Sequence, residues 1–157
     1  MNPSLKPEII AVVDAGQDLT LATLRPDGWP QATTVSYASE GLNIYFGVNA
    51  QSQKAANIAH DDRVSATIDL PYDSWDEIRG LSLGGRARRV TDPQEMARAG
   101  ELFLKKFPQI AGVLQPGGFE LALFRIDAEF ISLLDYRKGF GTSVPVRRAE
   151  LDQPGAV

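Results

Sequence analysis

The chain has 157 residues, of which 43% are hydrophobic, and it carries a formal net charge of -4 at pH 7. This length suits a single domain with one core, and the absence of cysteine excludes disulfides, thiolate nucleophiles and cysteine-ligated metal centres. Because an acidic chain is poorly suited to the phosphate backbone of nucleic acid, we expect no nucleic-acid partner and instead a small-molecule substrate or a protein partner.

The sequence also predicts no membrane association. No run of about 18 apolar residues is present, and the first ten residues, MNPSLKPEII, lack the basic-then-apolar pattern of a signal peptide. We therefore expect a cytoplasmic location.

The first half of the chain predicts two helices among strands. Apolar residues at helical spacing between Pro7 and Gly16 predict an opening helix. The segment SQKAANIAH predicts a second, short helix that leaves Gln53 and Asn57 in solvent. Segments rich in β-formers and separated by turn sequences predict four antiparallel strands, at LTLATLR, QATTVSYA, LNIYFGV and RVSATIDL.

The second half continues the β-rich pattern around one strong helix. Gly84 and Gly85, inside RGLSLGGRARRV, indicate a bulge or a sharp bend in a strand. In DPQEMARAGELFLKKF, Asp92 is the predicted N-cap of a helix and Glu95 completes a capping box. The other predicted elements are a loop at PYDSWDEI, strands at FELALFRIDA and EFISLLDY, and a polar, loosely ordered tail at RRAELDQPGAV. This pattern predicts a mainly β protein, closed or partly closed as an antiparallel barrel.

Ser52 and Lys54 stand where the short helix begins, and two interpretations are open. Free N–H groups and the positive end of the helix dipole attract anions, so a hydroxyl and an ammonium there would complete a phosphate site. Alternatively, Ser52 is an ordinary N-cap and Lys54 a solvated charge.

Other polar residues allow the same kind of double interpretation. The hydroxyls of Thr33, Thr34 and Ser36 could line a polar ligand, although threonine is also an ordinary strand former. His60, the only histidine, fits a helix end better than a catalytic triad. The acidic residues of the predicted loop lack metal-ligand spacing, so we expect no metal site. The basic residues Arg86, Arg88 and Arg89 are either solvated or in contact with an anion. The ring of Phe140, between two glycines, is either a hydrophobic anchor of an ordinary turn or a cover for a planar cofactor.

Taken in order, these segments resemble the pyridoxamine 5'-phosphate oxidase-like flavin-binding split barrels, particularly the general stress protein group. The resemblance covers about residues 8–142. It rests on the ordered set LATLRPDGWPQATTVSY, IYFGVNAQSQKAANIAHDDRVSATI, LGGRARRVTDP, FLKKFP and ISLLDYRKGFG.

The resemblance implies a single domain over residues 1–142 and a polar tail over residues 143–157. The implied fold is mainly β with flanking helices, a six-stranded antiparallel Greek-key split β-barrel. It also implies a homodimer that holds FMN at its interface. The implied cofactor-binding residues are Thr33, Thr34, Val35 and Ser36 beside the flavin ring, Gly47 and Val48 near the ring and ribityl chain, Ser52, Gln53 and Lys54 at the phosphate, and Phe140 as a ring that reaches the flavin from one subunit or the other.

The chain departs from the family pattern at two of these positions. Family members usually carry arginine where Gln53 stands, and the oxidase itself has arginine where Thr33 stands. The carboxy-terminal substrate-binding segment of the oxidase has no counterpart here. These departures speak against pyridoxamine phosphate oxidation as the activity.

Three functions follow as hypotheses from the resemblance. The first is an FMN-dependent oxidoreductase, in which the cofactor carries the redox chemistry and no side chain stands out as a catalytic acid or base. The second is a reductase that binds a deazaflavin coenzyme at the same phosphate site. The third is a flavin-binding stress-response protein without turnover. A heme-binding split barrel is a further possibility, for which His60 is a poor ligand.

Overall fold

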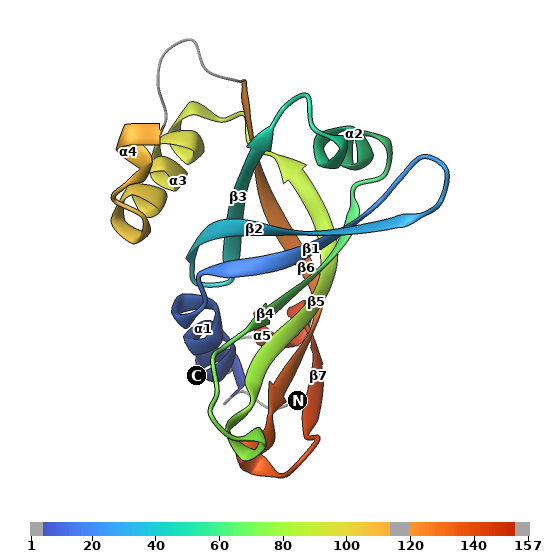
Figure 1. The fold of residues 1–157 in the computed structure, drawn as a ribbon, viewed down its shortest axis with the longest axis vertical. Helices are drawn as coiled ribbons and strands as arrows, with labels where there is room; N and C mark the ends of the chain where they lie inside the picture. Colours follow the sequence, from blue (N-terminus) through green and yellow to red (C-terminus); the bar gives the residue numbers. More distant parts are fainter. Residues whose placement is uncertain (1–4, 114–119, 153–157) are drawn as a thin grey trace.

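The computed structural model describes residues 5–113 and 120–152. Within these residues, seven strands form one antiparallel sheet in the order β3-β2-β1-β4-β5-β6-β7. A further pairing of β3 with β6 closes the first six strands into a barrel, with β7 outside it (Figure 1). The strands are β1 (Asp18–Leu24), β2 (Pro30–Glu40), β3 (Asn43–Asn49), β4 (Arg63–Asp69), β5 (Arg79–Arg89), β6 (Leu121–Asp135) and β7 (Ser143–Arg147).

The helices lie outside the barrel wall (Figure 1). They are α1 (Leu5–Ala15), α2 (Gln53–His60), α3 (Pro93–Lys106), α4 (Ile110–Val113) and α5 (Arg148–Leu151), with the 3-10 turns η1 (Trp75–Glu77) and η2 (Tyr136–Lys138). Among the described helices, none combines the length and the apolar character needed to cross a bilayer.

The strand order confirms the predicted Greek-key topology. Strands β1, β2 and β3 follow one another as hairpins, and β4 returns to lie beside β1, which gives the neighbour order β4-β1-β2-β3. The protein is therefore mainly β, with a six-stranded antiparallel barrel and few flanking helices.

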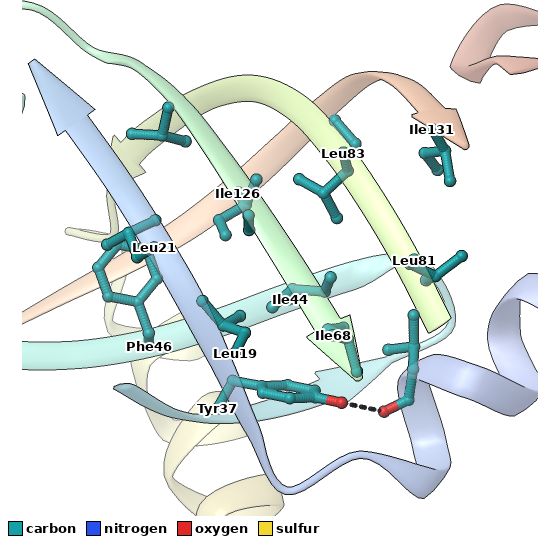
Figure 2. Close-up of a cluster of buried hydrophobic side chains, with 14 of the residues drawn as sticks. Leu19, Leu21, Tyr37, Ile44, Phe46, Ile68, Leu81, Leu83, Ile126 and Ile131 are labelled. Carbon is teal, nitrogen blue, oxygen red and sulfur yellow. Dashed lines mark hydrogen bonds between the residues drawn. The ribbon is translucent and has the colours of Figure 1, made fainter. Parts of the chain in front are cut away.

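The core fills the barrel because alternate side chains of each strand point inward. Strand β4 shows this most regularly: Val64, Ala66 and Ile68 are buried and the residues between them are exposed. Figure 2 shows the inward side chains of several strands meeting around Phe46 and Ile126. The buried Tyr37 hydroxyl donates a hydrogen bond to the Val13 carbonyl oxygen at 2.6 Å, which ties α1 to the sheet.

The predicted bulge at Gly84 and Gly85 is confirmed, and it corrects another prediction. Gly84 pairs with Phe130 whereas Gly85 pairs with Ala128, so Glu129 of β6 has no partner in this register. A Cβ atom on Gly85 would lie 2.1 Å from the Asp127 carbonyl oxygen, so only glycine permits this approach. The two strands predicted at FELALFRIDA and EFISLLDY are therefore one strand, β6, because the break in alternation between them is a bulge and not a turn.

Helix α3 begins as predicted, with one difference. The Asp92 carboxylate accepts a hydrogen bond from the Glu95 backbone N–H at 3.2 Å, which confirms the N-cap. The Glu95 carboxylate is used elsewhere: it accepts from the Tyr45 hydroxyl at 2.9 Å and from Arg125 at 2.5 Å. Glu95 therefore joins α3 to β3 and β6 instead of completing a capping box.

The segment after residue 142 differs from the predicted polar tail. Residues 143–147 form β7, which pairs with β6, and residues 148–151 form α5, whose Leu151 is buried in the core. The alternation of apolar residues in β7 covers only five positions, so it gives a weak strand signal in the sequence. Pairing with the long strand β6 stabilises β7 in the fold. The predicted loop at PYDSWDEI contains the single turn η1. The predicted strand start at Phe119 and the last five residues of the tail lie outside the described residues.

The bulge yields a stability prediction. Replacing Gly85 with alanine should lower the free energy of unfolding by about 1–3 kcal/mol, because the new Cβ would overlap the backbone of β6. Urea unfolding followed by circular dichroism measures this loss.

Gly100→Ala is the matched control, because a Cβ atom at this exposed position of α3 meets nothing within 4 Å. It should raise stability by about 0.5–1 kcal/mol, since alanine is the better helix former. Equal stability of the Gly85→Ala variant and the wild type would contradict the close approach at the bulge.

Candidate functional site

The barrel is split where β2 separates from β3. Strand β2 pairs with β1 along residues 30–36, but it pairs with β3 only from Tyr37 onward. Beyond Phe46, β3 continues to pair with β6 on its other edge. Figure 1 shows the β1–β2 hairpin diverging from β3, with α2 near the opening. In the described part of the chain, no strand pairs with residues 30–36 of β2 on the side of the split.

The open edge of β2 carries hydrogen-bonding backbone groups. The Tyr37 N–H donates to the carbonyl oxygen of Gln17, the residue before β1, at 3.5 Å. Because alternate residues of an antiparallel strand bond to opposite sides, the backbone groups of Thr34 and Ser36 face the split. An edge of this kind offers donors and acceptors to a planar ligand with polar atoms along its rim.

The side chains of this segment alternate between the two faces of the strand. Val35 is buried in the core, whereas Thr34 and Ser36 are exposed, and the Ser36 hydroxyl donates to Asp18 at 3.0 Å. Thr33 shares a face with Val35, and its hydroxyl oxygen is buried without a hydrogen-bond partner among the described residues. A buried hydroxyl without a partner costs about 1–3 kcal/mol, so Thr33 is an energetically unfavourable exception on this strand.

The end of β3 borders the same opening. Val48 points into the core, and Gly47 lies half-buried on the other face. A Cβ atom on Gly47 would lie 3.1 Å from a methyl carbon of Leu121, so the glycine keeps space open beside that side chain. The structure thus brings the predicted residues of β2 and β3 to the two sides of one split.

Helix α2 begins four residues after β3. Ser52 is its N-cap, as one interpretation predicted, and its hydroxyl oxygen accepts from the Ala55 N–H at 3.2 Å. Lys54 is half-buried, and no carboxylate of the described residues pairs with it within 4 Å. An uncompensated ammonium beside the positive end of a helix favours an anion at this position. The residues present therefore fit a phosphate group.

One residue of this site was mispredicted. Asn57, expected in solvent, is fully buried. Its side-chain N–H groups donate to the Thr23 hydroxyl at 3.0 Å and to the Gln31 amide oxygen at 3.1 Å. Its own oxygen accepts from the exposed Gln53 at 2.7 Å. Asn57 thereby fixes α2 to the β1–β2 hairpin, a role that helical periodicity did not reveal because its partners lie 26 and 34 positions away.

Phe140 is not close to this site within one chain. It lies between η2 and β7, and the connection from β6 to β7 is at the bottom of Figure 1, whereas α2 lies near the top. Its ring is 73% exposed and contacts Trp75 and Tyr136, with ring centroids 6.0 Å and 5.2 Å away. Contact between Phe140 and a cofactor at the split would therefore require a second copy of the chain.

The remaining candidates are occupied or exposed. Arg86 and Arg88 both pair with Asp62, at 2.6 Å and 3.1 Å, so these two side chains belong to a surface ion-pair network. Arg89 lies over the Phe124 ring. His60 is exposed at the end of α2. Within residues 5–113 and 120–152, no group of acidic or histidine side chains could hold a metal ion.

An antiparallel barrel that is split between two strands, with a helix start at the split, defines the class of split β-barrel proteins. A family model described as pyridoxamine 5'-phosphate oxidase matches residues 5–135. The chain belongs to that family.

Solved structures agree with this assignment. A conserved hypothetical protein from Mycobacterium tuberculosis is 30% identical over 85% of this chain and 86% of that one, with a TM-score of 0.74. A heme binding protein from Mycobacterium smegmatis is 21% identical over 96% of this chain and 60% of that one, with a TM-score of 0.78. General stress protein 26 from Bacillus anthracis is 19% identical over 91% and 98%, with a TM-score of 0.67. The last two show likeness of fold alone, and no curated protein matches this chain.

The buried Asn57 amide yields a prediction about the scaffold of the site. Asn57→Ala should lower the free energy of unfolding by about 2–4 kcal/mol, since it leaves the buried Thr23 hydroxyl and the Gln31 amide without their partner. Asn43→Ala, at an exposed position of β3, is the control and should change stability by less than about 0.5 kcal/mol. Similar values for both variants in urea unfolding would show that the Asn57 network contributes nothing.

The turn that presents Phe140 yields a pH prediction. The Asp135 carboxylate is buried and accepts from the Arg137 side chain at 2.7 Å and 2.8 Å, which holds its pKa below the usual value. A carboxyl group with a lowered pKa stabilises the fold above its unfolded pKa of about 3.9, and this stabilisation disappears as pH falls through the folded value. Asp135→Asn should therefore be less stable than the wild type at pH 7, and the difference should shrink below about pH 4.

Chemical unfolding of both proteins between pH 2 and pH 7 measures this difference. Asp73→Asn, at an exposed carboxylate of the neighbouring loop, is the control and should follow the wild-type curve. A difference between Asp135→Asn and wild type that stays constant with pH would contradict the ion pair.

Proposed function

We propose that the protein is a homodimeric FMN-binding flavoprotein that acts as an oxidoreductase on a small molecule. The observation that carries the proposal is the buried, unpartnered Thr33 hydroxyl on the strand that borders the split. Membership of the pyridoxamine 5'-phosphate oxidase family supports a flavin as the group that satisfies it.

The chain offers a different kind of contact to each part of FMN. Lys54 and the start of α2 would hold the phosphate. Thr33 and the backbone of Thr34 and Ser36 would line the ring, with Val35 packed behind them, and Gly47 and Val48 would border the ribityl chain. Bound FMN would supply hydride and electron transfer, while these residues bind and orient it.

Gln53 limits the affinity that we expect. Its amide is bonded to Asn57 at 2.7 Å, so it supports the scaffold rather than supplying a charge. The phosphate would then depend on charge-assisted hydrogen bonds from one lysine and from helix N–H groups, which are about twice as strong as neutral ones.

The outer face of the sheet supports the homodimer. Small side chains form a row across four adjacent strands, so no bulky side chain in that row would keep a second sheet away. The row consists of Thr34, Thr20, Thr67 and Ser82, which are all exposed and occupy matched positions of β2, β1, β4 and β5. A dimer would also allow Phe140 of one copy to approach the cofactor of the other.

Three other functions are distinguished from this one by direct assays. A deazaflavin coenzyme would use the same phosphate site, but the net charge of -4 disfavours its acidic polyglutamate tail. Tighter binding of that coenzyme than of FMN would replace our first choice. A stress-response protein without turnover would bind FMN but would not oxidise NADPH when FMN is supplied. For heme, the exposed His60 offers a poor ligand, and a Soret band in the purified protein would decide in its favour.

The phosphate site yields a binding prediction. Lys54→Ala should weaken FMN binding about 10- to 100-fold, because it removes a charge-assisted hydrogen bond worth about 1.5–3 kcal/mol. Flavin fluorescence quenching on titration measures the dissociation constant. Lys105→Ala is the control, because it removes the same charge at an exposed position of α3. It should leave the affinity for FMN unchanged.

Three results would contradict the proposal. One is a protein that is colourless as purified and that does not quench FMN. Another is unchanged affinity in Lys54→Ala, which would leave Lys54 as a solvated charge. The third is equal weakening in Lys54→Ala and Lys105→Ala, which would indicate long-range charge attraction without a site.

A further inference from the structure

Lys106, the last residue of α3, has an unusual environment for a lysine. Its ammonium group donates a hydrogen bond to the Tyr37 carbonyl oxygen at 2.8 Å. The same nitrogen lies 3.6 Å from the centroid of the Tyr37 ring and 5.4 Å from that of the Phe107 ring. Among the described residues, no carboxylate oxygen lies within 4 Å of it. The amine therefore faces two aromatic rings and one carbonyl oxygen.

The other lysines lack this combination. Lys6 and Lys138 each have a carboxylate within 4 Å. Lys54 contacts no aromatic ring in the described part of the chain. Lys105 precedes Lys106 in the sequence but is exposed. Lys106 is half-buried, so its amine has lost part of its water shell while the side chain stays partly open to solvent.

This environment favours the neutral amine. Burial lowers the pKa of Lys106 to about 8, although the carboxylates of Asp14 and Asp18, at the end of α1 and the start of β1, act in the opposite direction. The Tyr37 phenol stays neutral, because burial raises its pKa. About a quarter of the amine is therefore unprotonated at pH 7.5, against about a thousandth of an ordinary lysine.

A neutral amine is the nucleophilic form of lysine, and desolvation is one of the ways in which proteins produce it. The hydrogen bond to the Tyr37 carbonyl oxygen uses one N–H group of Lys106. The lone pair of the neutral amine does not take part in that bond. Position and protonation state thus combine to make this nitrogen reactive.

We propose that Lys106 is a site of N-acylation, at which its amine accepts an acyl group from an acyl thioester. The nitrogen attacks the carbonyl carbon, an N–C bond forms, the C–S bond breaks, and the leaving thiolate takes up the proton that the amine loses. The step needs no oxidant or reductant. It goes beyond the proposed function and does not require FMN.

Acylation would change the charge at this position more than the contact. The amide that forms retains one N–H, which can still donate to the Tyr37 carbonyl oxygen. The positive charge that faces Asp14 and Asp18 would be lost. The modification would therefore remove the electrostatic link between the end of α3 and the α1–β1 connection, while the hydrogen bond to β2 persists.

The test compares the acetylation rates of Lys106 and its neighbour Lys105 in the same molecule. The probe is S-acetyl-N-acetylcysteamine, a small uncharged thioester, and fragment-ion mass spectrometry assigns the acetyl group to one of the two residues. At pH 7.5, Lys106 should react at least about 10-fold faster, since its larger neutral fraction outweighs the lower nucleophilicity of a weaker base. Accessibility alone predicts the reverse order, because Lys105 is the exposed residue.

The pH dependence of the same ratio tests the cause of the preference. The ratio of the Lys106 rate to the Lys105 rate should fall as pH rises toward 10.5, because an ordinary lysine then loses its proton as well. In concentrated urea the ratio should approach one, because the preference depends on the fold. Lys105 reacting as fast as Lys106 in the folded protein, or a ratio that stays constant with pH or in urea, would overturn the proposal.

Phe107→Ala separates burial from access. Removal of this half-buried ring exposes the Lys106 amine to water, so the Lys106 rate at pH 7.5 should fall toward that of Lys105. A higher Lys106 rate in this variant, with an unchanged circular dichroism spectrum, would show that the ring only blocks access and would contradict the proposal. FMN is absent from these assays, so their failure would leave the flavin site untouched.

Discussion

The buried amide of Asn57 is the interaction on which the candidate site depends. Strand β3 leads into α2, whereas β1 and β2 turn away from β3 as a hairpin, so the two sides of the split share few backbone bonds. Asn57 crosses this gap with hydrogen bonds to Thr23 and Gln31. A fully buried amide whose hydrogen bonds are made tolerates little displacement, because any shift would leave polar groups unpaired in the core. Where strand pairing is absent, the two sides of the split are therefore joined by this polar contact together with the core packing of Ala55 and Ile58.

This arrangement explains how one short segment can serve both stability and binding. Ser52 caps the start of α2, and Asn57 holds the helix against the β1–β2 hairpin through its hydrogen bonds. Lys54 has no carboxylate partner among the described residues. On β2, odd-numbered side chains face α2 and the core, and the Thr33 hydroxyl among them is unpaired. Among the described residues, Thr33 carries the one buried side-chain hydroxyl without a hydrogen-bond partner, on a strand that borders the split.

Much of the fold could be predicted because its signals are local. The alternation of β4, the N-cap at Asp92 and the glycine pair at the bulge each depend on neighbours within a few positions. The continuity of β6, the ordering of residues 143–152 and the burial of Asn57 depend on partners far along the chain, so a local pattern could not reveal them. The candidate site followed mainly from the family resemblance. Its most informative feature is the Thr33 hydroxyl, which has no hydrogen-bond partner among the described residues. Sequence alone could not reveal this, because it depends on which groups surround Thr33 in the folded chain.

The most direct test of the site is to observe which backbone amides respond to FMN. In heteronuclear NMR of the ¹⁵N-labelled protein, our account predicts that FMN shifts the amide signals of Thr33–Ser36, Gly47, Val48 and Ser52–Lys54 most. Signals from the bulge at Gly84 and Gly85 and from His60 should change little. Shifts that cluster around those two regions, or an unchanged spectrum at saturating FMN, would contradict a flavin site at the split of the barrel.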